Sequence, residues 1–217
     1  MENKEKNSMM YTVGEEIFNS VSHGVGVLLS IAALVLMVAF ACIYSDGYAL
    51  AGALVYGISL ILLYTMSMVY HIVQSKTAKK VLRIFDHCSI FILIAGTYTP
   101  YLLGPLRGAV GWTVFGIIWG VTVIGIILNA INLEKFKKLS LICYILMGWG
   151  IVLSIKPLAQ NIEPMGIILL GVGGLVYTAG VFFYVMKKYR YMHSVWHLFV
   201  LAGSIFHYFS ILLYVMK

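Results

Sequence analysis

Two histidines, His193 and His197, stand in an H-x-x-x-H spacing. On a helix this spacing places both imidazoles on one face, one turn apart, where they can bind the same metal ion. An open zinc site uses three protein ligands, so a third must come from another segment, and His71 is the candidate. Imidazole suits zinc, whereas calcium and magnesium prefer carboxylate oxygens, of which the chain has few. The sequence therefore predicts a zinc site formed by these three histidines.

Two further side chains are candidates for chemistry beside that metal. No glutamate lies between the paired histidines, so a general base must come from elsewhere in the chain. Asp86 is the candidate, either as general base toward a water molecule or as the carboxylate that orients a ligand imidazole. Ser67 lies one turn before His71, and its hydroxyl could hold the water or stabilise an oxyanion. Together these residue types favour a hydrolytic site.

A third group lies near the N-terminus, where polar residues recur at helical spacing on one face of an apolar segment. They are expected to line or brace the same pocket: Glu16, Asn19, Ser20 and His23.

Each of these features also has a simpler interpretation. An H-x-x-x-H spacing occurs by chance, single histidines are common at a membrane boundary, and Asp86 could simply pair with Arg83 one turn away. His207 lies about 15 Å beyond His197 along a helix and is expected to make an interhelical hydrogen bond instead of binding metal. His87 points away from Asp86 and is only a reserve ligand. The metal hypothesis depends on these residues meeting in space.

The composition indicates that the helices carrying these candidate residues are surrounded by lipid and not by water. Of 217 residues, 61% are apolar and only 11% charged, which exceeds what a water-facing surface tolerates. A membrane-spanning helix takes about 20 apolar residues, so the whole chain is one membrane domain, 1–217, with short connections. The three cysteines lie apart, so neither a thiolate site nor a disulfide framework is indicated. We expect an all-α integral membrane protein.

Apolar stretches between charge clusters predict a bundle of seven transmembrane helices, near 18–43, 48–74, 84–103, 109–131, 138–157, 164–186 and 194–216. Alternate connections then fall on opposite sides, with twelve Lys and Arg residues on one side and three on the other. The twelve are Lys4, Lys6, Lys76, Lys79, Lys80, Arg83, Lys135, Lys137, Lys138, Lys187, Lys188 and Arg190, and the three are Arg107, Lys156 and Lys217. The positive-inside rule predicts a cytoplasmic N-terminus and an outside C-terminus. The net charge of +7 is thereby assigned to topology and anionic lipid, not to nucleic acid.

The candidate residues are expected to lie at the same depth in the membrane. Odd spans run outward and even spans inward, so the start of the first span, the end of the second, and the starts of the third and seventh all lie at the cytoplasmic face. His23, His71, Asp86 and the pair at 193 and 197 occupy these positions. Ionisable residues inside a membrane are expensive, which makes their convergence a functional signal.

These motifs resemble the hemolysin III family, the bacterial branch of the progestin and adipoQ receptor group. The matching segments are Glu16–Gly24 (EIFNSVSHG), Ser67–His71 (SMVYH), Asp86–His87, His193–His197 (HSVWH) and Phe206–His207. The resemblance implies a seven-helix protein of the cell membrane with zinc held by His71, His193 and His197, and with Ser67 and Asp86 close to the metal. It also implies kinship with eukaryotic proteins that look like zinc-dependent amide hydrolases of lipids.

Three functions remain in competition at this point. The first is a zinc-dependent, ceramidase-like hydrolase of a lipid amide or ester bond, with membrane lipids as substrate. The second is a non-enzymatic sensor or homeostasis protein in which zinc is structural. The third is a pore-forming hemolysin, which is weakly supported because the polar residues gather at one face. A retinal protein is excluded, since the seventh span has no lysine before Lys217, and the tight grouping at one interface disfavours haem.

Overall fold

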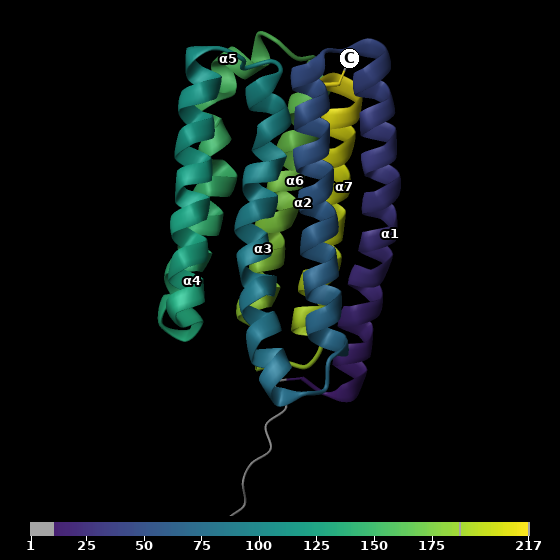
Figure 1. The fold of residues 1–217 in the computed structure, drawn as a ribbon, viewed down its shortest axis with the longest axis vertical. Coiled ribbons are helices and arrows are strands. Elements are labelled where there is room, and N and C mark those ends of the chain that lie inside the picture. Colours follow the sequence, from purple (N-terminus) through teal and green to yellow (C-terminus); the bar gives the residue numbers. More distant parts are fainter. Residues whose placement is uncertain (1–10, 187, 217) are drawn as a thin grey trace, which may run out of the picture.

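Every regular element in the described residues, 11–186 and 188–216, is helical in the computed structural model. The elements are α1 (Val13–Tyr44), α2 (Gly47–Ile72), α3 (Lys76–Leu103), α4 (Ala109–Trp149), the 3-10 helix η1 (Gly150–Ser154), α5 (Ile155–Ala159), α6 (Pro164–Val185) and α7 (Met192–Tyr214). The long helices run side by side, and α1 begins at the end of the bundle opposite to the end where α7 finishes (Figure 1). Four residues of the charge count, Lys4, Lys6, Lys187 and Lys217, lie outside the described residues.

Short polar residues begin the first three helices. Thr12 and Glu15 form a capping box at the start of α1, in which each side chain satisfies a backbone amide of the other. Asp46 accepts from two amides in the first turn of α2, and Ser75 accepts from the amide of Ala78 in α3. These caps fix where the helices start and hence the depth of their polar residues.

Two helices begin before the membrane spans that hydropathy predicts from near 18 and 84. α1 begins at Val13 and α3 at Lys76, so the charged cluster before the third apolar stretch is helical as well. The apolar stretch marks the part of a helix that sits in lipid, while the cap marks where the helix begins. The extra turns of α3 carry Lys79 toward α1, which matters for the site.

Six helical stretches of the described residues are long and apolar enough to cross a membrane, and one of them, Ala109–Ala159, has 51 residues. Within it Asn132 has non-helical backbone (φ −161°, ψ 90°), where two helices meet across a kink. Ser140 donates to the Asn129 side-chain oxygen at 2.6 Å, although residues eleven apart in a straight helix are separated by about 16 Å. The chain therefore reverses near Asn132, and Figure 1 shows the two arms of α4 side by side. The predicted spans 109–131 and 138–157 both lie in this stretch.

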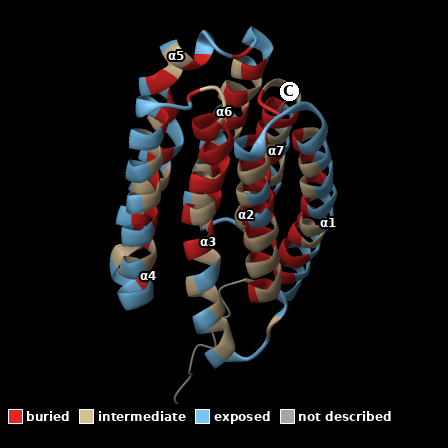
Figure 2. Ribbon diagram, turned by 45° about the horizontal axis from the view of Figure 1, so that its top comes forward, coloured by how far each residue is buried: buried red, intermediate tan, exposed pale blue. Residues whose placement is uncertain are grey.

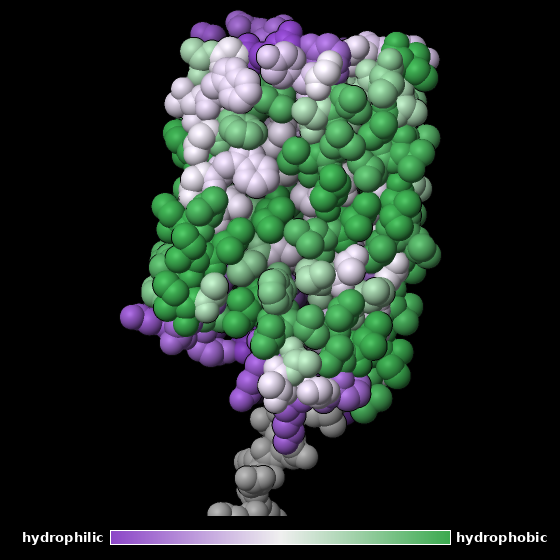
Figure 3. Space-filling model, in the orientation of Figure 1, coloured by the Kyte–Doolittle hydropathy of each residue, from purple (hydrophilic) through white to green (hydrophobic). Residues whose placement is uncertain are grey.

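The outer surface is apolar, as expected in lipid. Buried residues concentrate on α2, α3 and α7, whereas the outward faces of α1 and α4 are largely exposed (Figure 2). These exposed faces carry large apolar side chains such as Leu28 of α1 and Ile131 of α4, which are 69% and 71% exposed. Hydrophobic residues cover the middle of the visible face and hydrophilic residues gather at both ends (Figure 3). The fold is thus an all-α membrane bundle.

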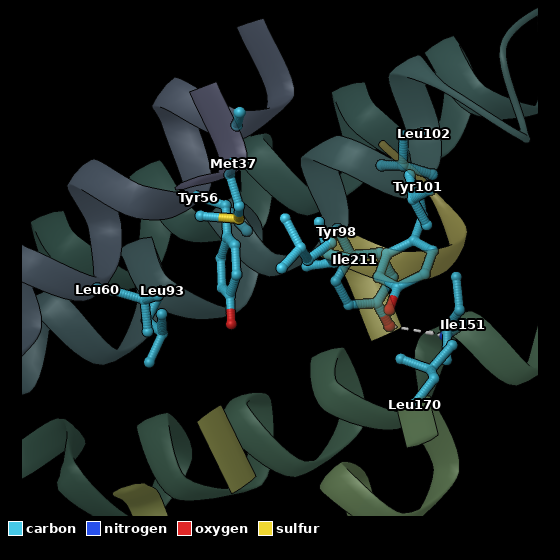
Figure 4. Close-up of a cluster of buried hydrophobic side chains, with 14 of the residues drawn as sticks. Met37, Tyr56, Leu60, Leu93, Tyr98, Tyr101, Leu102, Ile151, Leu170 and Ile211 are labelled. Atoms are coloured by element: carbon cyan, nitrogen blue, oxygen red, sulfur yellow. Dashed lines mark hydrogen bonds between the residues drawn. The ribbon is translucent and has the colours of Figure 1, made fainter. Parts of the chain in front are cut away.

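Hydrogen bonds and close packing hold the interior, because lipid supplies little hydrophobic force between helices. Met37, Tyr56 and Ile211 are fully buried in the core (Figure 4). Tyr98 accepts from the amide of Ile151 at 2.6 Å, which ties α3 to η1 across the cluster drawn in Figure 4. Such contacts hold the helices rigidly enough to position a site at the end where α2 finishes and α7 starts.

Candidate metal centre

The structure brings His71, His193 and His197 together. One ring nitrogen from each lies within 4.8 Å of the other two. His71 comes from the last turn of α2, and the other two come from the first turns of α7. The Nε2 atoms of His193 and His197 are 3.1 Å apart. Two nitrogens that bind one zinc tetrahedrally at about 2.0–2.1 Å are separated by about 3.3 Å, so the pair fits a shared zinc ion closely.

His71 is oriented by a carboxylate. Its Nδ1 lies 2.6 Å from Oε2 of Glu16, while its Nε2 is buried without a hydrogen-bond partner among the described residues. Lys79 donates to the other oxygen of Glu16 at 2.5 Å. A ligand histidine characteristically donates its second ring N–H to a carboxylate, which leaves the opposite nitrogen free to bind the metal. The arrangement of His71 matches that pattern.

A second set of hydrogen bonds fixes the start of α7 against α1. Ser194 donates to the side-chain oxygen of Asn19 at 2.6 Å, and Nδ2 of Asn19 lies 3.5 Å from Nδ1 of His71. Glu15 accepts from the amide of Tyr191, a residue with left-handed backbone (φ 61°) immediately before α7. Both contacts bridge α1 and α7, so the position of the paired histidines depends on α1.

Aromatic rings enclose the cluster. His23 stacks on His197 with ring centroids 3.7 Å apart, and neither of its nitrogens has a hydrogen-bond partner among the described residues. Tyr11 stacks on His193 at 4.8 Å. His23 thus contacts the candidate ligand His197 directly, whereas the sequence predicted only that it would line or brace the pocket.

Ser67 and Asp86 lie together beside the cluster. Ser67 donates a hydrogen bond to the Asp86 carboxyl, and both residues line a cavity of about 150 Å³ together with His193 and His197. The alternative in which Asp86 is merely the partner of Arg83 is not favoured, because Arg83 pairs with Glu134 at 2.5 Å. A carboxylate therefore faces the same space as the histidines.

One predicted pocket residue is directed elsewhere. Ser20 is buried, but its hydroxyl donates to the carbonyl of Ile17 in its own helix at 2.9 Å. Serine hydroxyls inside helices commonly bond back to a preceding carbonyl, which removes them from a neighbouring site. Glu16, Asn19 and His23, by contrast, all contact the cluster as described above.

Four residues around the cluster were not predicted from the sequence. Lys79, Ser194 and Glu15 act on it through a partner, whereas Tyr11 stacks directly on His193. A signal existed for Glu15, since T-x-x-E before an apolar run is a capping box. No comparable signal existed for Lys79, because its contact with Glu16 spans 63 positions of the chain.

Sequence comparison finds a protein family and several relatives that this chain resembles. The sequence model of a family described as Haemolysin-III related matches residues 11–208. The chain is 42% identical to the Hemolysin-3 homolog of Bacillus subtilis, over 96% of this chain and 98% of that protein. It is 43% identical to Hemolysin-3 of Bacillus cereus, over 96% and 95%. It is 33% identical to human Monocyte to macrophage differentiation factor, over 76% and 71%. The family match contains the entire histidine cluster.

Proposed function

This chain belongs to the haemolysin-III-related family of multi-pass cell-membrane proteins, and we propose that it is a zinc-dependent hydrolase of a lipid amide or ester bond. The observation that carries the proposal is the convergence of three imidazole nitrogens within 4.8 Å, beside a cavity that also contains a carboxylate. Three neutral histidines are the donor set of open catalytic zinc sites.

The proposal includes the topology that places this site. We infer seven crossings, with the two arms of α4 counted separately because the chain reverses at Asn132. Nine described Lys and Arg residues then lie on the side of the cluster and two on the other, which supports a cytoplasmic N-terminus and an outside C-terminus. The nine are Lys76, Lys79, Lys80, Arg83, Lys135, Lys137, Lys138, Lys188 and Arg190, and the two are Arg107 and Lys156.

Zinc, when bound, would act as a Lewis acid and lower the pKa of a water molecule toward ~7. The chain's own residues supply the rest. Glu16 holds the His71 ring through Nδ1, which would leave Nε2 to bind the metal, and Asp86 would accept a proton from the attacking water. The hydrogen bond from Ser67 keeps the Asp86 carboxyl in place, so we assign Ser67 a positioning role and not stabilisation of an oxyanion.

Depth and wall chemistry favour a membrane lipid as substrate. The candidate ligands lie in the terminal turns of α2 and α7. In the proposed topology this end of the bundle would lie near the headgroups, where the ester and amide bonds of lipids are found. The cavity continues from there between α2, α3, the second arm of α4, α6 and α7, along apolar residues such as Leu63 and Ile94. A lipid whose head lies at the cluster could place its chain there.

A structural zinc site is the second candidate, and one observation favours it. His23 is stacked on His197 with both nitrogens unpartnered among the described residues, so a small rotation could make it a fourth ligand. Four protein ligands would close the site and leave no position for water. X-ray absorption on the zinc-loaded protein separates the two candidates, because three imidazoles with one oxygen support the hydrolase and four imidazoles support the structural site.

The test of the hydrolase proposal has two stages. Zinc content is measured for the wild type, for His193→Ala/His197→Ala, and for His87→Ala as a histidine control outside the cluster. Zinc near one per chain in the wild type and the control, lost in the double variant, is the expected result. Turnover of amide and ester lipids is then compared with Asp86→Asn, which should retain zinc and lose at least about a hundredfold in rate. A zinc-loaded wild type that hydrolyses no lipid in the panel refutes the proposal.

A further inference from the structure

The cavity beside the histidine cluster extends to a sixth histidine, His207, on α7. His207 lies ten residues beyond His197, which is about 15 Å deeper along the helix. It is only 7% exposed and lines the cavity wall. Its role is not explained by the metal site, because a separation of 15 Å excludes it from zinc coordination there.

The other polar groups on the deep wall are committed to partners within the protein. Thr97 donates to the carbonyl of Leu93 at 2.8 Å, and Thr178 donates to that of Gly174 at 2.8 Å. Tyr98 donates to the carbonyl of Met147. The hydroxyl of Tyr177 shares a 2.7 Å hydrogen bond with that of Ser204. The hydroxyls of Thr97, Thr178 and Tyr98 therefore have no donor left for a ligand, and that of Tyr177 is already bonded to Ser204, where either oxygen could be the donor.

His207 differs from these groups because part of its hydrogen-bonding capacity is unused. Its Nδ1 is buried without a partner among the described residues. The ring is held in place, since a Cβ at Gly173 would lie 2.6 Å from its Cδ2 and the ring of Tyr177 packs at 5.4 Å. Buried polar atoms are nearly always satisfied by protein, water or ligand, so an unpartnered nitrogen in a rigid ring needs an explanation.

We propose that His207 is a second polar recognition point, which binds a hydroxyl group on the chain of a lipid held with its head at the histidine cluster. A neutral imidazole has one donor and one acceptor nitrogen, and a hydroxyl both donates and accepts, so the two are complementary. Most of the remaining cavity wall is apolar and suits the hydrocarbon of such a lipid. The ligand class is therefore an elongated lipid with a hydroxyl on its chain roughly 15 Å from the headgroup end. The inference rests on the proposed function for the orientation of the lipid, but binding does not require turnover.

The test measures binding without hydrolysis. Quenching of tryptophan fluorescence is suitable because Trp149 and Trp196 line the cavity. The probes are fatty acids of one chain length, without a hydroxyl or with a hydroxyl moved stepwise along the chain. The full-length protein is compared with His207→Phe, which removes both ring nitrogens, and His207→Gln, which keeps a donor and an acceptor. Thr97→Val is the matched control, since its hydroxyl is already bonded to the protein.

We expect the wild type to bind the best hydroxylated probe roughly five- to tenfold tighter than the plain one, the effect of one buried hydrogen bond. The preference should disappear in His207→Phe and persist in His207→Gln and Thr97→Val. Equal affinities in the wild type would mean that water satisfies His207, and the proposal would be wrong. A preference that survives in His207→Phe, or a folded wild type that binds no probe, would also overturn it. Hydrolysis can fail without affecting any of these outcomes.

Discussion

Glu16→Gln tests whether α1 orients His71, the candidate metal ligand of α2. The Glu16 carboxylate is 9% exposed and lies between two partners, at 2.6 Å from Nδ1 of His71 and 2.5 Å from Nζ of Lys79. The amide has no negative charge, so it holds Lys79 more weakly and polarises the imidazole less. Removing the outer partner of a metal-ligating histidine typically costs a factor of 10–100 in metal affinity, or about 1.4–2.7 kcal/mol. We expect Glu16→Gln to weaken zinc binding by that amount.

The assay is a competition titration of zinc against a chelator, with protein in detergent micelles or nanodiscs. Glu134→Gln is the matched control. Glu134 also binds two cationic side chains, Arg83 and Lys137, each at 2.5 Å, but it does not contact the histidine cluster. Because its side chain is 57% exposed, its loss should leave zinc affinity within experimental error. Circular dichroism confirms that both variants remain helical.

Two results would refute the reasoning. Zinc affinity of Glu16→Gln equal to that of the wild type would show that the carboxylate does not orient a ligand. Equal losses in Glu16→Gln and Glu134→Gln would attribute the effect to general electrostatics at this face of the membrane, and not to the contact with His71.

Two further predictions concern packing and acid stability. Gly125→Ala should lower the free energy of unfolding by about 1–3 kcal/mol in thermal melts, because its Cβ would lie 2.3 Å from the ring of Phe91. Gly116→Ala, with nothing within 4 Å of its Cβ, should not be destabilising. The amides in the first turn of α2 and then Arg107 lower the pKa of Asp46, so its contribution to stability is present above its unfolded pKa and is lost as the pH falls through the folded value. Asp46→Asn should abolish that part of the acid dependence, and an unchanged acid melting curve would contradict this assignment.

The sequence could predict that the three histidines meet, because the prediction requires only the depth of each residue in the membrane and the direction in which each helix crosses it. Span length and charge clusters place the end of α2 and the start of α7 at one face, and the structure brings His71 and His193 together there. The rotation of each helix about its axis is not specified in the same way. Ser20 shares the helical spacing of Glu16 and Asn19, yet its hydroxyl bonds to its own helix. Periodicity identifies a face, whereas the hydrogen bonds that a side chain makes depend on neighbours remote in sequence.

The break within α4 was hard to locate precisely for a related reason. No glycine or proline interrupts residues 126–140, and the charged residues there are good helix formers. The chain turns at Asn132, whose side-chain oxygen accepts from the amide of Lys135 at 3.0 Å. Asparagine thus acts as the cap of the second arm, a role that depends on the arms packing against each other. The predicted first span ended at 131, directly before the turn at Asn132, but the second resumed only at 138, although the second arm begins at the Asn132 cap.

The site is assembled by a helix that contributes none of the three candidate ligands. α1 orients His71 through Glu16, holds α7 through Asn19 and Ser194, and caps its own start with a residue that also binds the turn before α7. α2 and α7 alone would bring the histidines near one another without fixing their rings. Because the hydrogen bonds that orient the ligands also join three helices, binding of metal and stability of this end of the bundle should be coupled. The proposed catalytic site and a rigid membrane fold would therefore require the same hydrogen bonds, and whether a bound metal would be catalytic or structural would depend on His23.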